Sequence, residues 1–512
     1  MTEKQFVIGL DIGTTSAKAV IFHKNGIVLA ENEQPYPVKH PEPGWAEQDP
    51  VLIEEAAIKA LRTAIINGKI NGKNILSVGL SSAMHSLICI DNKWDALSPS
   101  ITWADGRAIS QADNLKNTDK GTSIYLRTGT PIHPMSPLTK LIWMRENRIE
   151  AYEQAKRFVS IKEFLTGRWF DTASVDYSIA SATGMFDIET LSWNEEALEL
   201  AGISVSQLST PVEPTFIFQG MHPSIAERIG IPADIPFAAG GSDGPLANLG
   251  IGAIDPGETA ITIGTSGAIR QMNAKPRTDE KQQVFCYAFS KERWILGGPI
   301  NNGGIVLQWL NDVLGQETLE TAINKNEDPY TIMLSAAEKV APGANGLLFL
   351  PYLNGERAPH WDANARASFI GLSMHHHKSH MVRAGLEGVL FSLLSVSAAL
   401  RQLTGETNTL YASGGFARSS FWVQMLADIF GQDIHLPMSH QSSAWGAAWC
   451  SLLAVNEVNT FQEIKEHIPM RDTIKPHMET HQTYTELYQV YRSLYDSLKP
   501  TFTQLAAFRN SS

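Results

Sequence analysis

A turn rich in glycine and hydroxyl side chains follows the first apolar segment of the chain. The turn is Gly13-Thr14-Thr15-Ser16, and Asp11 borders it. Consecutive backbone N–H groups and short side chains let a phosphate approach the main chain. A carboxylate would repel that phosphate directly, but it suits a hydrated Mg²⁺ that bridges phosphate oxygens. The turn therefore predicts a phosphate site with Asp11 as the metal ligand, and an ordinary hairpin is the alternative.

A second turn of the same type lies near the middle of the chain. Ile263-Gly264-Thr265 repeats the tripeptide Ile12-Gly13-Thr14, and Ser266 follows it. Each copy ends an apolar strand at the start of a predicted domain, which indicates an internal duplication. Two such turns, one in each domain, would hold a nucleotide between them, so Gly264, Thr265 and Ser266 are predicted to bind phosphate.

An acidic residue ends another apolar strand inside Gly240-Gly241-Ser242-Asp243-Gly244. Functional groups of α/β proteins gather at such strand ends. A hydroxyl that accepts a phosphoryl group needs a carboxylate to orient it and take its proton. Asp243 could also be a helix N-cap, but the small residues before it leave room for a ligand and favour a catalytic base.

A glycine pair, Gly414-Gly415, precedes a predicted helix and would bring the backbone close to a flat or anionic group. The P-loop and the protein-kinase motifs are absent from the sequence. A nucleotide site built on these glycines is therefore of another type.

The elements that must position these residues read as mixed sheets covered by helices. Segments 5–11, 17–22 and 27–31 predict an antiparallel meander, and Asp49-Pro50 predicts the start of a helix. Further strands are predicted at 75–80, 235–239, 259–263, 346–352 and 409–413, with a long helix over 382–400. This pattern is typical of an α/β architecture. A length of 512 residues implies two domains, with a third possible, and we place the two at 1–247 and 248–512.

The charge balance narrows the class of partner. Lys and Arg total 41 against 53 Asp and Glu, a net charge of −12, which repels nucleic acid and acidic membranes. Three cysteines, an odd number, favour reduced thiols over a disulfide framework. No run reaches the roughly 18 apolar residues of a membrane span. We expect a cytoplasmic protein with a small-molecule substrate, and the choice between a monomer and a homodimer stays open.

Taken in order, these motifs resemble the FGGY family of carbohydrate kinases, which belong to the actin-like ATPase superfamily. The stretch 135–147 is similar to the first signature of that family throughout, and 351–359 and 369–372 also resemble it. The resemblance implies two actin-like (ribonuclease H-like) α/β domains with a nucleotide cleft between them. It also implies ATP and Mg²⁺ as cofactors, with the sugar-type substrate and the base Asp243 in the first domain and ATP in the second.

Two motifs suggest the substrate. Segments 81–88 and 103–107 look most like those of the family members that phosphorylate the 6-hydroxyl of D-gluconate to give 6-phospho-D-gluconate. Ser86 replaces a glycine of the xylulose-phosphorylating members, although xylulose or another polyol or ketose stays the alternative. Within the motifs, His85 and Asp105 can bind hydroxyls and Trp103 can form an apolar wall.

Arg107 has two interpretations that the sequence leaves equal: it pairs with the substrate carboxylate, or it forms a salt bridge within the fold. Two other function classes are disfavoured. The Asp243 turn and the polyol-type motifs argue against a non-enzymatic actin-fold ATPase, and the acidic charge argues against a sugar-responsive DNA-binding regulator.

Overall fold

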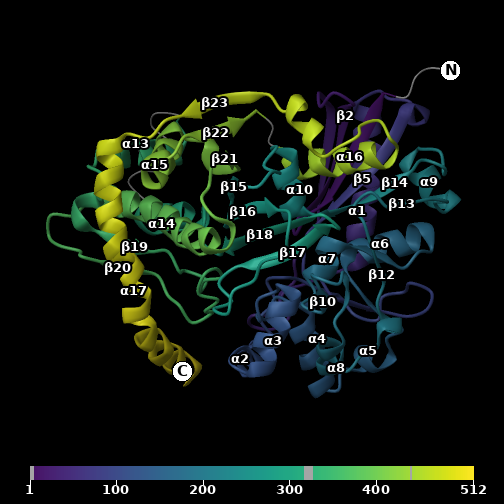
Figure 1. The fold of residues 1–512 in the computed structure, drawn as a ribbon, viewed down its shortest axis with the longest axis horizontal. Helices are drawn as coiled ribbons and strands as arrows, with labels where there is room; N and C mark the ends of the chain where they lie inside the picture. The colour runs from purple at the N-terminus through teal and green to yellow at the C-terminus, as the bar shows by residue number, and fades with distance from the viewer. Residues whose placement is uncertain (1–4, 316–326, 439–440, 512) are drawn as a thin grey trace. The chain divides into compact units, whose positions relative to one another are not determined.

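The computed structural model describes residues 5–315, 327–438 and 441–511 (Figure 1). The chain forms two compact units. The first contains Met1–Pro256, Met272–Leu296 and Gln441–Pro469, and the second contains Gly257–Gln271, Gly297–His440 and Met470–Ser512.

The units therefore interleave along the chain, whereas the sequence predicted contiguous domains 1–247 and 248–512. Backbone hydrogen bonds hold one of the added segments to the first unit: Cys286 N donates to Gly129 O at 2.8 Å. The Ala288 amide donates to the Ser181 hydroxyl at 3.0 Å. The assignment of sugar-acid binding to one range and ATP binding to the other stays a prediction.

The first unit is built on a six-stranded sheet in the order β13-β14-β5-β1-β2-β3. Strands β1 (Phe6–Ile12), β2 (Ser16–His23) and β3 (Val28–Pro35) form the predicted antiparallel meander. Strand β5 (Ile75–Ser82) runs parallel to both β1 and β14 (Phe237–Ser242), and β13 (Ile217–Phe218) closes the edge. The carboxyl ends of β1, β5 and β14 thus meet at one edge of the sheet.

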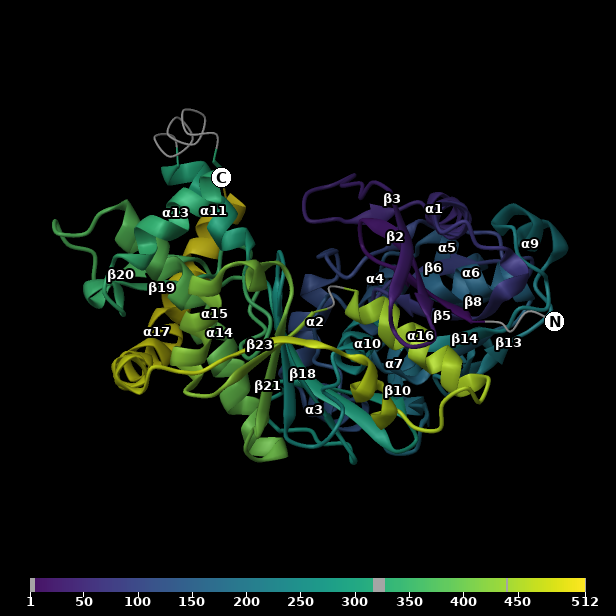
Figure 2. The same cartoon turned by 90° about the horizontal axis from the view of Figure 1, so that it is seen from above.

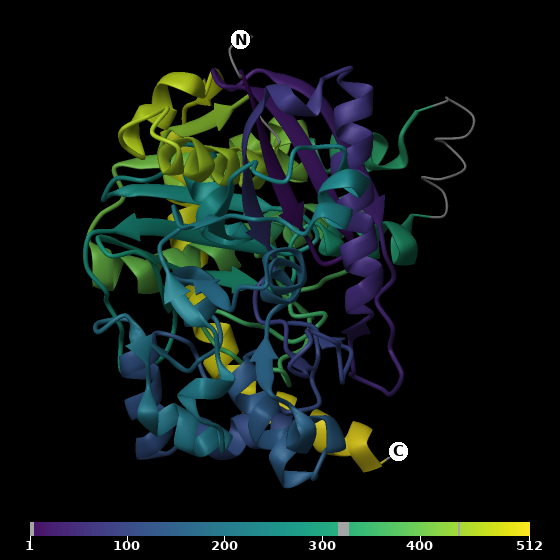
Figure 3. The same cartoon turned by 90° about the vertical axis from the view of Figure 1, so that its right-hand side faces the viewer.

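Both faces of this sheet are covered, because side chains of β1 alternate between two cores. Ile8 and Leu10 pack in the core that includes residues of α1 (Pro50–Asn67), whose first turn is capped by Asp49 as predicted. Val7 packs in the opposite core with α10 (Asp243–Gly250) and α16 (Ser442–Ala454). Figure 3 shows the purple strands of the meander between these helices.

Helix α16 approaches the sheet closely, because glycine stands where it crosses β1. A Cβ atom on Gly9 would lie 1.9 Å from the carbonyl oxygen of Ala444. This contact explains why residues 441–469 belong to the first unit.

A helical part of the first unit has its own core. It contains α2 (Ile109–Lys116), α3 (Asp119–Thr128), α4 (Pro137–Glu146), α5 (Glu150–Gln154) and α8 (Glu195–Ala201). Two further helices, α6 (Ile161–Phe170) and α7 (Tyr177–Ser181), are almost fully buried.

The second sheet has the order β17-β18-β16-β15-β21-β22-β23. Its strands are β15 (Glu258–Ile263), β16 (Gly267–Asn273), β17 (Phe285–Ser290), β18 (Arg293–Ile300), β21 (Thr409–Ser413), β22 (Ile434–Pro437) and β23 (Met470–Ile474). The central strand β15 pairs antiparallel with β16 and parallel with β21, as β1 does with β2 and β5. The repeated Ile-Gly-Thr tripeptide therefore ends the corresponding strand of both sheets, in agreement with an internal duplication.

The helices of the second unit are α11 (Ile305–Leu314), α13 (Pro329–Glu338), α14 (Lys378–Thr404), α15 (Ser420–Phe430) and α17 (Met478–Ser511). Helices α14, α15 and α17 pack against one another (Figure 2). Within the described residues, α14 is the one helix long and apolar enough to cross a membrane, yet 78% of its apolar window is buried inside the protein. It is therefore packed as a core helix.

The three cysteines are buried free thiols. Burial raises the pKa of the Cys89 thiol and of the Cys286 thiol to about 12. The thiolate is the reactive form, so these side chains are unreactive near neutral pH and act as small apolar groups.

Candidate active site

Two predicted site carboxylates lie near each other in the first unit. Asp11 stands near the end of β1, and Asp243 directly follows β14; both strands pair with β5. The Ser81 hydroxyl on β5 donates to Asp11 Oδ1 at 2.7 Å. Burial and the charge of Asp243 raise the pKa of Asp11 to about 6, against the opposing effect of Lys18 and Lys162. The sheet therefore places the two carboxyl groups close enough for the charge of Asp243 to raise the pKa of Asp11.

Asp243 is the first residue of α10, and the N-cap position belongs to Ser242. Its Oδ1 atom accepts a hydrogen bond from Gly244 N at 2.7 Å, and its backbone oxygen accepts one from the Ser443 hydroxyl at 3.3 Å. The N-cap of α10 is therefore Ser242 and not Asp243, which was the alternative role considered for Asp243.

The first glycine-threonine turn is held from behind by side chains. The Tyr36 hydroxyl donates to Gly13 O at 2.6 Å, and Gln48 Nε2 donates to Thr14 O at 2.6 Å. The indole of Trp103 donates to Thr14 Oγ1 at 2.9 Å. The carbonyls and the threonine hydroxyl thus have protein partners, which fixes the shape of the turn.

The last two residues of this turn differ in their surroundings. Thr15 is exposed, and its carbonyl accepts a hydrogen bond from Tyr36 N at 3.0 Å. The Ser16 hydroxyl donates to Glu33 Oε1 at 2.5 Å. A phosphate contact by either hydroxyl stays a prediction, and Ser16 would first have to leave Glu33.

His85 is buried and held in a left-handed backbone conformation with φ of 65°. Its Nδ1 atom lies 2.6 Å from Ala182 O. Its backbone carbonyl accepts a hydrogen bond from Lys140 Nζ at 2.7 Å, and the same ammonium donates to Thr102 O at 2.8 Å. Burial lowers the pKa of Lys140 to about 7. Lys140 therefore ties the His85 segment to the residue before Trp103, a role that sequence reasoning missed.

Arg107 and Asp105 are bound to each other. Asp105 Oδ1 accepts from Arg107 Nε at 2.8 Å, and Asp105 Oδ2 accepts from Arg107 Nη2 at 2.8 Å and from Ala46 N at 2.7 Å. Arg107 Nη2 also donates to Glu47 Oε1 at 2.6 Å, and the guanidinium stacks 3.8 Å above the centre of the Trp45 ring. Of the two interpretations of Arg107, the structure contains the salt bridge within the fold.

Ser86, which distinguishes this motif from its xylulose-type counterpart, has a local structural partner. Its hydroxyl accepts a hydrogen bond from Ile161 N at 2.9 Å, at the start of α6. The same helix begins with a capping box formed by Ser160 and Glu163. A glycine at position 86 could not satisfy this buried amide.

The second glycine-threonine turn is held from behind by backbone. Gly304 N donates to Gly264 O at 2.7 Å, and Gly303 N donates to Thr265 O at 3.1 Å. Glu356 holds this supporting loop, because its Oε1 atom accepts from Asn301 N at 2.6 Å. Burial raises the pKa of Glu356 to about 7. The glycine pair at 303–304, directly after an apolar strand, is the signal that could have identified the loop.

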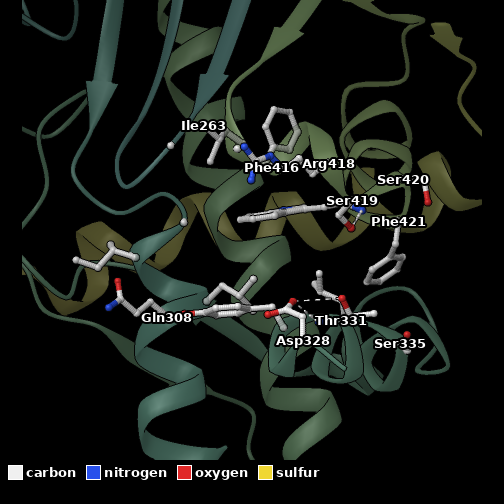
Figure 4. A pocket seen from close by; sticks show the side chains of 18 of the residues that line it. Ile263, Gln308, Asp328, Thr331, Ser335, Phe416, Arg418, Ser419, Ser420 and Phe421 are labelled. Atoms are coloured by element: carbon white, nitrogen blue, oxygen red, sulfur yellow. Dashed lines mark hydrogen bonds between the residues drawn. The ribbon is translucent and has the colours of Figure 1, made fainter. Parts of the chain in front are cut away.

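A cavity of about 660 Å³ in the second unit lies beside this turn. Gly264, Thr265 and Gly415 line it, as predicted for a nucleotide site, while Ser266 and Gly414 are outside the described lining. The sequence reasoning missed its polar and aromatic groups (Figure 4), which include Gln308, Asp328, Tyr330, Thr331, Phe416, Arg418, Ser419, Phe421 and Trp422. Flat apolar surfaces with a few polar groups are typical of a site for an aromatic ligand.

Gly414 has a supporting position. Its φ is 101°, and a Cβ atom there would lie 2.4 Å from Ile263 O. It therefore lets β21 pass close to the end of β15, next to the second turn.

The carboxylate of Asp11, with Asp243 nearby, is a donor that fits Mg²⁺. No group of three or more His, Cys, Asp or Glu side chains that could hold a metal occurs among the described residues. Mg²⁺ usually keeps several waters and takes one or two carboxylates together with substrate phosphates. A pair of carboxylates whose mutual repulsion raises a pKa suits such a cation.

Comparison with protein-family descriptions gives two matches. The N-terminal domain of the FGGY family of carbohydrate kinases matches residues 6–250, and the C-terminal domain of that family matches residues 259–455.

Similar curated proteins cover nearly the whole chain. A gluconokinase of Bacillus subtilis (strain 168) is 46% identical over 92% of this chain and 93% of its own length. A gluconokinase of Bacillus licheniformis is 44% identical over 99% of this chain and 98% of its own length. A xylulose kinase of Bacillus subtilis (strain 168) is 28% identical over 99% of this chain and 100% of its own length.

Two solved structures from Lactobacillus acidophilus resemble the fold equally. One is described as a gluconate kinase and the other as a ligand-bound xylulose kinase. Each has a TM-score of 0.92 and 35% identity and covers 98% of this chain and 99% of its own.

Proposed function

Since the chain belongs to the FGGY family of carbohydrate kinases, we propose that it transfers the γ-phosphoryl group of ATP to the 6-hydroxyl of D-gluconate. The products are 6-phospho-D-gluconate and ADP. The observation that carries the proposal is that Asp11 and Asp243 lie at the ends of two strands that both pair with β5, close enough to interact electrostatically. Phosphoryl transfer to an alcohol needs a carboxylate for the alcohol and a charge partner for the phosphates. The 44–46% identity to gluconokinases supports gluconate as the acceptor.

Asp243 acts as the catalytic base. It orients the 6-hydroxyl and accepts its proton as the hydroxyl oxygen bonds to the γ-phosphorus and the bond from that phosphorus to the ADP oxygen breaks. An ordinary aspartate has a pKa of about 3.9, so orientation contributes more than basicity. The position of Asp243 at the start of α10 supports this role, since the side chain is fixed by a helix that packs on the sheet.

Asp11 would hold Mg²⁺, which when bound neutralises charge on the transferring phosphoryl group. The turn Gly13-Thr14-Thr15-Ser16 would lie along the phosphates. Gly13 would let them approach the main chain while its own amide donates to Ser16 O, and the Ser16 hydroxyl would be available once it leaves Glu33. The hydrogen bonds from Tyr36, Gln48 and Trp103 behind the turn support preorganisation, which lets such donors stabilise charge without rearrangement.

The sugar acid is proposed to lie against His85, Trp103, Asp105 and Arg107. Asp105 and Arg107 are buried, and their contacts with each other, with Glu47 and with Trp45 support a substrate site whose side chains are fixed before the sugar acid binds. Through Lys140, this site is connected to His85, which supports one preformed sugar site.

ATP is proposed to bind the second unit. The adenine ring of ATP would enter the cavity lined by Phe416, Phe421 and Trp422. The phosphates would lie along Gly264, Thr265, Ser266, Gly414 and Gly415. The presence of Gly264 and Thr265 in that cavity supports a continuous nucleotide site. The nucleotide cleft between the two domains stays a prediction. We also propose a cytoplasmic location, which the three free, buried cysteines support.

The test is an ATP-dependent phosphorylation screen with D-gluconate, D-xylulose, ribulose and glycerol, in which ADP release and the phosphorylated product are both measured. We expect the largest kcat/KM for gluconate and no turnover without Mg²⁺. A larger kcat/KM for xylulose would overturn the acceptor while leaving the kinase reaction intact. ATP hydrolysis that no acceptor changes would overturn the kinase itself.

A further inference from the structure

The strand that leads to Asp243 contains an irregularity a few residues before that residue. Strand β14 runs parallel to β5, but its register shifts between Ala238 and Gly241. Gly240 has a φ of 59°, and a Cβ atom there would lie 1.9 Å from Leu80 O. This irregularity aims the end of the strand, and backbone groups that leave a ladder need other partners when they are buried.

A buried lysine supplies those partners. Lys162 Nζ donates to Ala239 O at 2.9 Å and to Gly241 O at 2.8 Å, on both sides of Gly240. The lysine lies on α6, and its side chain is only 5% exposed. Its charge is balanced by Asp176 Oδ2 at 2.5 Å. The ammonium therefore makes two hydrogen bonds to the backbone and one ion pair.

The same network reaches the residue that precedes Asp243. Asp176 Oδ1 accepts from the Ser178 hydroxyl at 2.6 Å. The oxygen of that hydroxyl in turn accepts from Ser242 N at 2.7 Å. The carbonyls of Ala239 and Gly241 and the amide of Ser242 are thus held by one connected set of buried polar groups.

We propose that Lys162, with Asp176 and Ser178, is a positioning residue that fixes the Gly240–Ser242 turn so that Asp243 points at the acceptor hydroxyl. The proposal rests on the proposed function only in taking Asp243 as the base. Lys162 is hydrogen-bonded to the backbone on both sides of Gly240, and in this proposal it acts through that backbone. A displacement of about 1 Å at a reacting group can cost about 100-fold in rate, so such a network has a measurable kinetic effect.

The decisive experiment is a double-mutant cycle between Lys162→Met and Asp243→Asn. We expect Lys162→Met alone to lower kcat about 10- to 100-fold, with the KM for ATP within about twofold. In the Asp243→Asn background, Lys162→Met should lower kcat no further, because misplacing residue 243 has no effect on the rate once its carboxylate has been removed.

Lys140→Met is the matched control. This second buried lysine also donates to backbone carbonyls, but those belong to His85 and Thr102. Its kinetic loss should be unchanged in the Asp243→Asn background. Equal losses from Lys162→Met in both backgrounds, or a folded Lys162→Met enzyme with wild-type kcat, would overturn the proposal.

A second variant guards against misfolding, since Lys162→Met leaves the buried Asp176 charge unpaired. Ser178→Ala keeps the Lys162–Asp176 ion pair and the backbone donors of Asp176 Oδ1, and it removes the acceptor for Ser242 N together with the hydroxyl donor to Asp176. We expect a smaller loss of kcat with the same dependence on Asp243, and additive losses would overturn the proposal.

Hydrogen exchange gives a readout that needs no substrate. In Lys162→Met and Ser178→Ala, a peptide covering 239–244 should exchange faster, while one covering β15 keeps the wild-type rate. Unchanged exchange at 239–244 would overturn the positioning role. Failure of the wild-type enzyme to phosphorylate gluconate, with the exchange result as expected, would instead overturn the proposed function alone.

Discussion

The two glycine-threonine turns occupy the same place in their sheets but differ in one functional residue. In the first sheet, Asp11 pairs in register with Ser81, whose hydroxyl donates to it at 2.7 Å. In the second, Thr262 stands two residues before Gly264 just as Asp11 stands two before Gly13. Thr262 pairs in register with Ser413, at 3.1 Å between the hydroxyl oxygens.

This difference separates two tasks. A carboxylate at the first position can hold a cation, whereas a neutral hydroxyl at the second adds no repulsion to a nearby phosphate. The same backbone arrangement can therefore serve charge compensation in one unit and nucleotide binding in the other.

The turns also differ in what holds them. Side chains of Tyr36, Gln48 and Trp103 support the first, while backbone amides of Gly303 and Gly304 support the second. Substitutions behind the first turn therefore remove a hydrogen bond directly, but the second turn is reached through the residues that hold its supporting loop, such as Glu356.

The largest effect is expected at Asp243, the proposed base in the first unit. Asp243→Asn should lower kcat about 10²- to 10⁴-fold, because the acceptor loses its base. Steady-state kinetics with gluconate would measure it, and the exposed Asp234→Asn is the control. Full kcat in Asp243→Asn would refute the assignment of the base.

A smaller but still large effect is expected at the position that distinguishes the two turns. Asp11→Asn removes a charge, and we expect kcat to fall by about 10²-fold, within the usual range for lost electrostatic stabilisation. The Mg²⁺ concentration for half-maximal rate should rise. Thr262→Val, the corresponding change in the second turn, should leave both values within about twofold, since it removes one neutral hydrogen bond. Equal losses of kcat in Asp11→Asn and Thr262→Val would mean that the two corresponding positions do not differ in function.

Adding the missing charge should harm the second turn. Thr262→Asp places a carboxylate beside the proposed phosphate site, and we expect the Kd for ATP to rise about 10-fold, equivalent to about 1.4 kcal/mol. Calorimetric titration with ATP would measure it, with Thr262→Asn as an isosteric neutral control. An unchanged Kd would place the phosphates away from this turn.

The last expected effect is on stability rather than on activity: it concerns the support of the second turn and depends on pH. The folded-state pKa of Glu356 is about 7, raised from 4.5 by burial, so the folded protein holds this proton more tightly than the unfolded chain. The stabilisation is fully present below pH 4.5 and is lost as the pH rises through 7. The free energy of unfolding of Glu356→Gln should therefore rise relative to wild type by up to about 1.4 kcal/mol per pH unit in that window.

Denaturant unfolding between pH 4.5 and 8 would check this prediction. Glu486→Gln, which changes an exposed carboxylate of the same unit, should show a difference from wild type that is independent of pH. A pH-independent difference for Glu356→Gln as well would mean that Glu356 is ionised throughout this range.

Local patterns predicted the elements that carry the site. The strands before both turns, the Asp49 cap of α1 and the strand over 409–413 follow from apolar runs and turn residues, which act over a few neighbouring residues. The repeated Ile-Gly-Thr tripeptide likewise marked corresponding strand ends, because each copy needs the same tight turn.

Other features depended on residues far apart in the chain. The sequence left two equal interpretations of Arg107, and the structure distinguishes them because it places Glu47 and Trp45 against the guanidinium. Lys162 was unmarked because its partners at 239 and 241 lie more than 70 residues away. The signal available was a lysine beside Glu163 in an otherwise apolar segment, Ile161, Phe164 and Leu165, but this pattern indicates burial without identifying a partner.

By itself, the sequence determined the α/β class and the two glycine-threonine turns at strand ends, because strand periodicity and turn chemistry are local properties of the chain. Only the tertiary structure decided which units the segments 272–296 and 441–469 join and which buried charges meet. Those outcomes depend on desolvation and on pairing between distant groups, whose free energies exist only once the sheets and helices have packed.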